Sequence, residues 1–169
     1  EPTKSDTDDD GYEDSIEITS GSDPNDTDSV PSFPTLDGLL ISEFMASNNS
    51  SILDSDDESS DWIEIWNPTN SEISLSNYYL TDDAGRLNKW AIPNISIGPN
   101  KFLVIFASGK DLNDPSKELH ADFQLSSSEG SYVALTRKNA DNNFTVVSAH
   151  GLYPRQVEDI SYGVFGDKS

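Results

Sequence analysis

The sequence contains no cysteine, few basic residues and no long apolar run. Without cysteine, the chain cannot form a disulfide, a thiol nucleophile or a Cys-ligated zinc or iron–sulfur site. Its 10 Lys and Arg residues stand against 31 Asp and Glu residues, so the formal net charge at pH 7 is −21. This charge disfavours binding to nucleic acid or an anionic membrane surface, because phosphate binding requires Lys and Arg. No run approaches the roughly 18 to 20 apolar residues of a membrane-spanning helix, so membrane insertion is not expected.

The composition changes sharply near residue 38. The first 37 residues contain few aliphatic or aromatic side chains, which are Tyr12, Ile16, Ile18, Val30, Phe33 and Leu36. Such a segment cannot bury enough apolar surface to offset the entropy lost on ordering. The two prolines of VPSFP favour an extended, semi-rigid connection. We therefore expect an N-terminal unit over residues 1–29, a proline-containing linker over 30–38 and a larger domain over 39–169.

Short β-rich segments alternate with turn residues throughout the larger domain. The nine candidate strands are residues 39–46, 61–67, 73–80, 89–92, 101–107, 121–125, 131–137, 144–150 and 159–165. Their spacing is typical of a β-sandwich or barrel. No window shows a convincing helical period over about 11 residues or more. The sequence therefore predicts an all-β domain.

Two of these segments predict which side chains face the core. In DWIEIWN, Ile63 and Ile65 alternate with bulkier or charged residues, which predicts a half-buried strand with the isoleucines facing inward. KFLVIFA is apolar on both faces, with Phe102, Val104 and Phe106 on one side. Apolar residues on both faces predict a central strand that is covered on both sides.

The stretch DTDDDGYEDSIE, residues 6–17, matches the calcium-loop pattern D-x-[DN]-x-[DN]-G-x5-E at every fixed position. Calcium takes six to eight oxygen ligands from a chain that wraps around it, and Gly11 permits the sharp turn that this requires. The predicted ligands are the carboxylates of Asp6, Asp8 and Asp10, the carbonyl of Tyr12, Asp14 through a water, and both oxygens of Glu17. A solvated acidic run is the alternative interpretation. The combined spacing, glycine and terminal glutamate favour a Ca²⁺ site.

The longer stretch DTDDDGYEDSIEITSGSDPNDTDS, residues 6–29, resembles a thrombospondin type 3-like repeat of bacterial surface proteins. A helix–loop–helix EF-hand does not fit, since only five residues precede Asp6 and Asp23-Pro24 follows soon after Glu17. In the repeat family, tandem acidic loops bind calcium and stiffen the stalk between domains. The resemblance ends at Val30-Pro31, where a second loop would begin. It implies calcium as the cofactor and a secreted or cell-surface location.

A second resemblance covers residues 39–163. The segments LLISEFMASNN, SDWIEIWNPTNSEISLSNYYLTDD, KWAIP, IGPNKFLVIFASGKD, HADFQLSSSEGSYVALT and DISYG, in this order, are similar to a lamin tail domain of the bacterial type. This resemblance implies an immunoglobulin-like β-sandwich that is mostly non-catalytic. Bacterial members accompany secreted or surface enzymes and anchoring modules, so neighbouring domains of a larger chain are expected.

The acidic loop between the first two predicted strands has two interpretations. Its carboxylates Asp54, Asp56, Glu58 and Asp61 stand at alternating or near-alternating positions, as in a looser second calcium site. However, Asp57 occupies a position where glycine would ease the turn. A solvated hairpin loop is the favoured interpretation.

No catalytic residue is predicted. Glu43 and Glu64 could act as an acid–base pair on a glycosidic bond, but glutamates in strands more often lie at an edge or pair with a base. His120 and His150 lack any neighbouring ligand motif, and Ser126–Ser128 lacks the context of a serine nucleophile.

Four aromatic residues, Trp66, Tyr78, Tyr79 and Trp90, form either an exposed platform for sugars or peptides or part of the core, and the core is favoured. The sequence thus predicts a non-catalytic, extracellular, calcium-binding structural or interaction module. The expected partners are calcium, another protein or a polysaccharide, and neighbouring domains, but not nucleic acid. The alternative is a carbohydrate-recognition module that accompanies a polysaccharide-active enzyme.

Overall fold

The computed structural model describes residues 6–8, 23–29 and 38–163. The chain divides into two units, Glu1–Leu36 and Asp37–Ser169, and each is considered by itself. In the first unit, residues 23–29 form two successive turns in which Asp26 N donates to Asp23 O (3.1 Å) and Ser29 N to Asp26 O (2.7 Å). No helix occurs in the three described ranges, and so none that could cross a bilayer.

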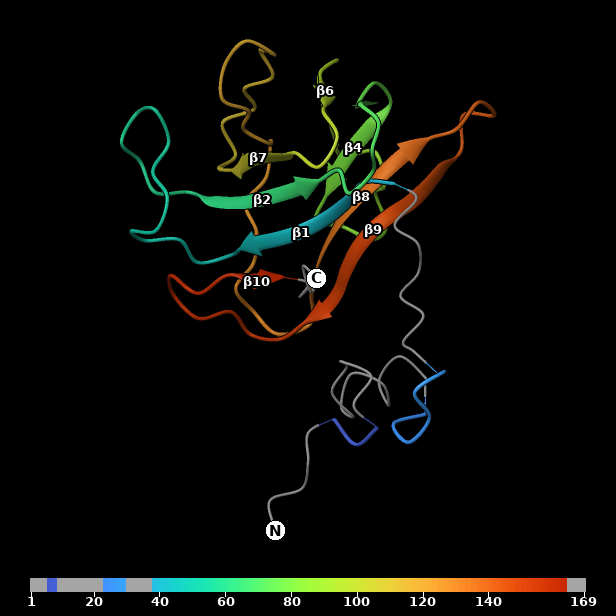
Figure 1. Ribbon diagram of the computed structural model, residues 1–169. Helices are drawn as coiled ribbons and strands as arrows, with labels where there is room; N and C mark the ends of the chain where they lie inside the picture. Colours follow the sequence, from blue (N-terminus) through green and yellow to red (C-terminus); the bar gives the residue numbers. More distant parts are fainter. Residues whose placement is uncertain (1–5, 9–22, 30–37, 164–169) are drawn as a thin grey trace. The chain divides into compact units, whose positions relative to one another are not determined.

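The second unit is built from two four-stranded antiparallel sheets (Figure 1). The first sheet has the order β10-β1-β2-β7 and the second the order β5-β4-β8-β9. The strands of the first sheet are β1 (Leu40–Met45), β2 (Asp61–Trp66), β7 (Phe102–Ala107) and β10 (Tyr162–Gly163). Those of the second are β4 (Tyr78–Thr81), β5 (Trp90–Ala91), β8 (Ser131–Lys138) and β9 (Phe144–Tyr153). A separate two-stranded sheet pairs β3 (Ile73–Ser74) with β6 (Ser96–Ile97).

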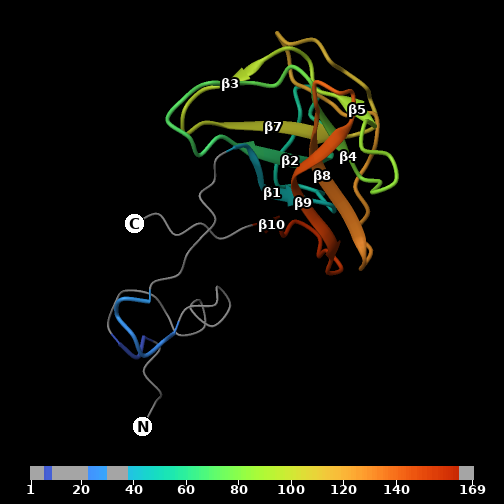
Figure 2. The ribbon, with the colours of Figure 1, turned by 90° about the vertical axis from the view of Figure 1, so that its right-hand side faces the viewer.

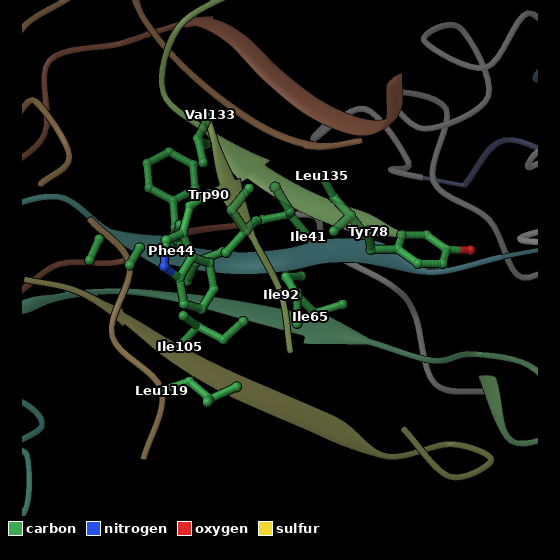
Figure 3. Packing of buried hydrophobic residues seen from close by; sticks show 14 of the residues in the cluster. Ile41, Phe44, Ile65, Tyr78, Trp90, Ile92, Ile105, Leu119, Val133 and Leu135 are labelled. Atoms are coloured by element: carbon green, nitrogen blue, oxygen red, sulfur yellow. The ribbon is translucent and has the colours of Figure 1, made fainter. Parts of the chain in front are cut away.

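The two large sheets pack face to face, as the two perpendicular views show (Figures 1 and 2). Ile41, Ile65 and Ile105 of the first sheet meet Val133 and Leu135 of the second in one buried cluster (Figure 3). Because side chains alternate across a strand, each sheet contributes every second residue to this core. The structure confirms the predicted all-β, immunoglobulin-like sandwich.

The isoleucines of β2 face the core as predicted, since Ile63 and Ile65 are both fully buried. Two side chains of β9 form hydrogen bonds with the backbone of β1 and so connect the two sheets. Ser148 Oγ accepts from Ile41 N (3.0 Å), and His150 Nε2 donates to Ile41 O (3.0 Å). His150 therefore has a structural role between the sheets.

The predicted strand 73–80 is wrong as a single element. The chain turns between β3 and β4, where Tyr78 N donates to Leu75 O (2.9 Å) and Asn77 adopts a φ of 74°. Asparagine tolerates this left-handed conformation better than most residues, so the turn is local in origin. As a result, β3 and β4 belong to different sheets.

The predicted central position of β7 is also wrong, because β7 lies at an edge of the first sheet. Its free edge is hydrogen-bonded by the segment around His120, which bridges to Phe106. The predicted strand 121–125 is wrong, since Gln124 forms only an isolated bridge to Ser108, just beyond β7. Phe106 N donates to Leu119 O (2.9 Å), and Ala121 N donates to Phe106 O (2.8 Å). The outer side of β7 therefore has two parts, since Phe102 is exposed whereas Phe106 is buried in a small cluster with Met45 and Trp62.

Candidate interaction site

The side of the first sheet that faces away from the core, called the outer face below, has three cross-strand rows of side chains. Strand register aligns Leu40, Trp66 and Phe102 in one row, Glu43, Glu64 and Val104 in the next, and Met45, Trp62 and Phe106 in the third. Their neighbours Ile63, Ile65 and Ile105 point into the core, so alternation directs these rows outward.

A bulge in β1 sets the register of the first two rows. The pairing of β1 with β2 shifts between Ile41 and Glu43, which leaves Ser42 as the extra residue. An extra residue of this kind lets Leu40 and Glu43 share one face although they are an odd number of positions apart. The Ser42 hydroxyl donates to Glu64 Oε1 (2.7 Å). The bulge therefore both aligns Glu43 with Glu64 and supplies a hydrogen bond to the pair.

The first row presents an accessible aromatic pair. The rings of Trp66 and Phe102 are stacked, with centroids 5.7 Å apart and an interplanar angle of 11°. Phe102 is 46% exposed and Trp66 is half-buried. Stacked, partly accessible rings form a flat apolar surface that suits a planar or apolar ligand group.

The second row places two carboxylates directly opposite each other. Glu43 and Glu64 are cross-strand partners, and both are half-buried. The Ser161 hydroxyl donates to Glu43 Oε1. Neither glutamate forms an ion pair with any residue in the described ranges. Like charges directly opposite each other destabilise a sheet. A bound cation would remove this cost.

The third row is covered and forms a small apolar cluster outside the main core. Met45, Trp62 and Phe106 are buried, and Val104 packs against them. The ring of His120 stacks on Phe106 with centroids 5.1 Å apart. Trp62 Nε1 is buried and has no hydrogen-bond partner in the described part of the chain.

His120 serves this cluster as a covering group. Its Nδ1 lies 2.9 Å from the hydroxyl of Ser108, which also accepts from Lys110 N (3.2 Å). The direction of the bond between Ser108 and His120 is set by the tautomer of the ring. Burial lowers the pKa of His120, which is consistent with a neutral ring in this position. These contacts give His120 a packing role at the edge of the first sheet.

Asn67 holds the chain at the end of β2, directly after Trp66. Its side chain is fully buried, and Nδ2 donates to the carbonyls of Ser71 (2.7 Å), Ile97 (2.9 Å) and Gly98 (3.0 Å). Oδ1 accepts from Thr69 N (3.0 Å) and Thr69 Oγ1 (2.8 Å). One amide thus joins two turns beside the aromatic row.

Three carboxylates of the acidic loop after β1 share ion pairs with one lysine. Lys110 Nζ lies 2.5 Å from Asp54 Oδ2, 2.9 Å from Glu58 Oε2 and 3.4 Å from Asp56 Oδ2. Asp54 Oδ1 accepts from the backbone amides of Asp56 (3.0 Å) and Glu58 (2.9 Å). The hydrogen bond from Lys110, with these amides, holds the pKa of Asp54 below its usual value.

The fourth carboxylate considered for a second calcium site lies elsewhere. Asp61 accepts from Asn48 N (3.4 Å), and burial raises its pKa. An ammonium group therefore occupies the centre around which the other three carboxylates gather. Among the residues that the structure describes, no group of three or more His, Asp or Glu side chains is arranged to hold a metal.

The predicted calcium ligands are only partly within the described ranges. Asp6 and Asp8 are described, whereas Asp10, Tyr12, Asp14 and Glu17 lie outside them. The calcium site therefore stays a prediction from sequence.

The four aromatic residues singled out from the sequence do not gather on one surface. Trp90 and Tyr78 belong to the core, and Tyr79 makes an edge contact with Phe144, with centroids 5.2 Å apart. Trp66 alone joins the outer face, where its partner is Phe102. Sequence reasoning missed this partner because the alternation within β7 shows a shared face but not the cross-strand register.

Comparison with known families bears on the same unit. The model of the Lamin Tail Domain matches residues 34–152. The chain belongs to this family. The lamin tail domain is a non-enzymatic, immunoglobulin-like structural and interaction domain, in agreement with the observed sandwich. A search of curated proteins found no match. The matched residues do not include 6–29, so the thrombospondin type 3-like repeat is still a prediction.

Proposed function

We propose that this chain is a non-catalytic interaction module in which the lamin tail sandwich presents its outer face to a partner. The observation that supports this role is the stacked pair of Trp66 and Phe102 beside the carboxylates of Glu43 and Glu64. Both rows stand on hydrogen-bonded strands that are anchored in the core, so the surface is rigid before a partner arrives. The net charge of the chain, −21, disfavours nucleic acid as that partner.

The N-terminal unit, in this proposal, is a calcium-stiffened stalk of a secreted or cell-surface protein that contains further domains. The support comes from the spacing of Asp6, Asp8, Asp10, Tyr12, Asp14 and Glu17. Carboxylates about 6 Å apart repel by roughly 0.7 kcal/mol per pair even in water, so a compact acidic loop requires a cation.

Calcium titration of the full chain, followed by calorimetry, tests the stalk. We expect binding with a dissociation constant on the order of 10⁻⁴ to 10⁻³ M, as in other extracellular calcium modules. Asp6→Ala and Glu17→Ala should abolish the heat change, whereas Asp9→Ala should retain it, because Asp9 is not a predicted ligand. Absence of any heat change at millimolar calcium would refute the site.

Carbohydrate recognition is a second candidate function, and the stacked ring pair favours it, since sugars stack on such surfaces. Binding on a glycan array that is lost in Trp66→Ala and Phe102→Ala would support it. Trp90 is unsuitable for this test because its side chain belongs to the core.

A further inference from the structure

We propose that the outer face binds a basic, extended peptide segment of a partner protein. This inference rests on the proposed interaction function and specifies the chemistry of its ligand. A Lys or Arg side chain would lie between Glu43 and Glu64, and a second would lie over the ring of Trp66.

The charge of the middle row selects a cation. Glu43 and Glu64 face each other across β1 and β2 and receive only serine hydroxyls from the described residues. A hydroxyl satisfies an acceptor but does not neutralise a charge, so the repulsion within the pair persists. A cationic side chain placed between the two carboxylates removes this repulsion and forms charge-assisted hydrogen bonds. Sugar hydroxyls would provide hydrogen bonds but no charge.

The adjacent aromatic row suits a second cation. Arg guanidinium groups stack on indole rings, and Trp is the strongest aromatic partner for a cation. Glu64 and Trp66 are two residues apart on β2 and point to the same side, which separates them by about 6.6 to 6.8 Å. An extended peptide repeats its side chains on one face at the same interval. Basic residues at alternate positions would therefore match the two rows.

The covered row contains a further group without a partner. Trp62 is 5% exposed, and no acceptor in the described part of the chain takes its Nε1 hydrogen. Trp62 lies on the same strand and the same face as Glu64. Buried indole N–H groups normally find an acceptor. Because this row is covered by the packing of Met45 and Phe106, the donor lies below the outer surface, and the peptide is placed on the second row and on Trp66 alone.

The N-terminal segment of the same chain does not complement the charge of Glu43 and Glu64. Residues 1–37 contain twelve Asp and Glu residues, from Glu1 to Asp37, and a single Lys. A second copy of this chain is unfavourable for the same reason, because its net charge is also −21. Charge complementarity therefore requires a different, basic partner.

The test uses the full chain and a short fluorescein-labelled peptide of alternating Arg and Ser, followed by fluorescence anisotropy at about 0.15 M salt. We expect the variant Glu43→Gln/Glu64→Gln to bind about tenfold more weakly or worse. Trp66→Leu should also weaken binding of the Arg peptide. Glu43→Gln and Glu64→Gln are also measured singly, and their matched control is Glu129→Gln, which removes one exposed charge from the turn before β8 and should leave affinity within about twofold.

Each outcome decides the proposal. Glutamine retains an oxygen for the Ser42 and Ser161 hydroxyls, and thermal unfolding of each variant verifies the fold. Equal affinity of the double variant, the control and the wild type would show diffuse attraction and overturn the proposal. Displacement of the peptide by a soluble polysaccharide through Trp66 would overturn it in favour of carbohydrate recognition. Absence of peptide binding would not change the calcium titration. The proposal of peptide binding and the proposal of a calcium site can therefore fail separately.

Discussion

Removal of the buried amide of Asn67 should cause a large loss of stability. Its side chain makes five hydrogen bonds to the turns at residues 69–71 and 97–98, and all are buried or partly buried. A typical neutral hydrogen bond contributes about 1 kcal/mol net, and a buried group left unpaired costs about 1 to 3 kcal/mol. Asn67→Ala should therefore lower the free energy of unfolding by about 3 to 5 kcal/mol.

Asn67→Asp tests the same geometry with a residue of nearly the same shape. The substitution directs a carboxylate oxygen at the carbonyls of Ser71, Ile97 and Gly98, so it should be more destabilising than Asn67→Ala at pH 7. Burial among carbonyls raises the folded-state pKa of the new carboxyl above its unfolded value of about 3.9. The excess penalty should therefore be absent below that unfolded value and increase as pH rises towards the folded pKa.

Urea denaturation followed by tryptophan fluorescence measures both variants, because Trp66 is adjacent to the site. Asn113→Ala, at an exposed position, is the control and should change stability by about 0.5 kcal/mol or less. A loss below about 1 kcal/mol for Asn67→Ala would refute the argument. So would an Asn67→Asp variant that is no less stable at pH 7 than Asn67→Ala.

Two further substitutions test contacts that join distant segments. Lys110→Met should destabilise the protein at pH 7 because Asp54, Asp56 and Glu58 lose their shared cation. Lys110 lowers the pKa of Asp54, so its stabilising effect is present above the unfolded pKa and lost as pH falls through the folded one. Denaturation at pH 7 and at pH 3 should show that the stability difference between variant and wild type is smaller at pH 3. Gly163→Ala would place a Cβ 2.5 Å from Ser42 O, so we expect a loss of about 1 to 3 kcal/mol and faster amide exchange at the β1–β10 pair. Gly38→Ala, where nothing lies within 4 Å of the added Cβ, should have little effect. An equal loss of stability in both variants would contradict the close approach of β10 to Ser42.

The sequence alone determined the fold class and the inward side of β2. Alternation has a period of two residues and is written in each strand, so Ile63 and Ile65 could be assigned to the core before any partner strand was known. The order of strand segments also indicated the lamin tail family, which the family match confirms. The spacing of the acidic loop predicts a calcium site by the same local logic, and that prediction awaits its titration.

Only the tertiary structure decided what stands on the outer face. Trp66 meets Phe102 through the register of β2 with β7. Glu43 meets Glu64 through the register of β1 with β2, which depends on the bulge at Ser42. A bulge shifts every pairing beyond it, and no local period reveals where it falls. Lys110 likewise reaches Asp54 across 56 positions of sequence, a contact that the spacing of the acidic loop did not indicate. Local spacing identifies the chemical groups, whereas strand register and long-range contacts determine which of them meet.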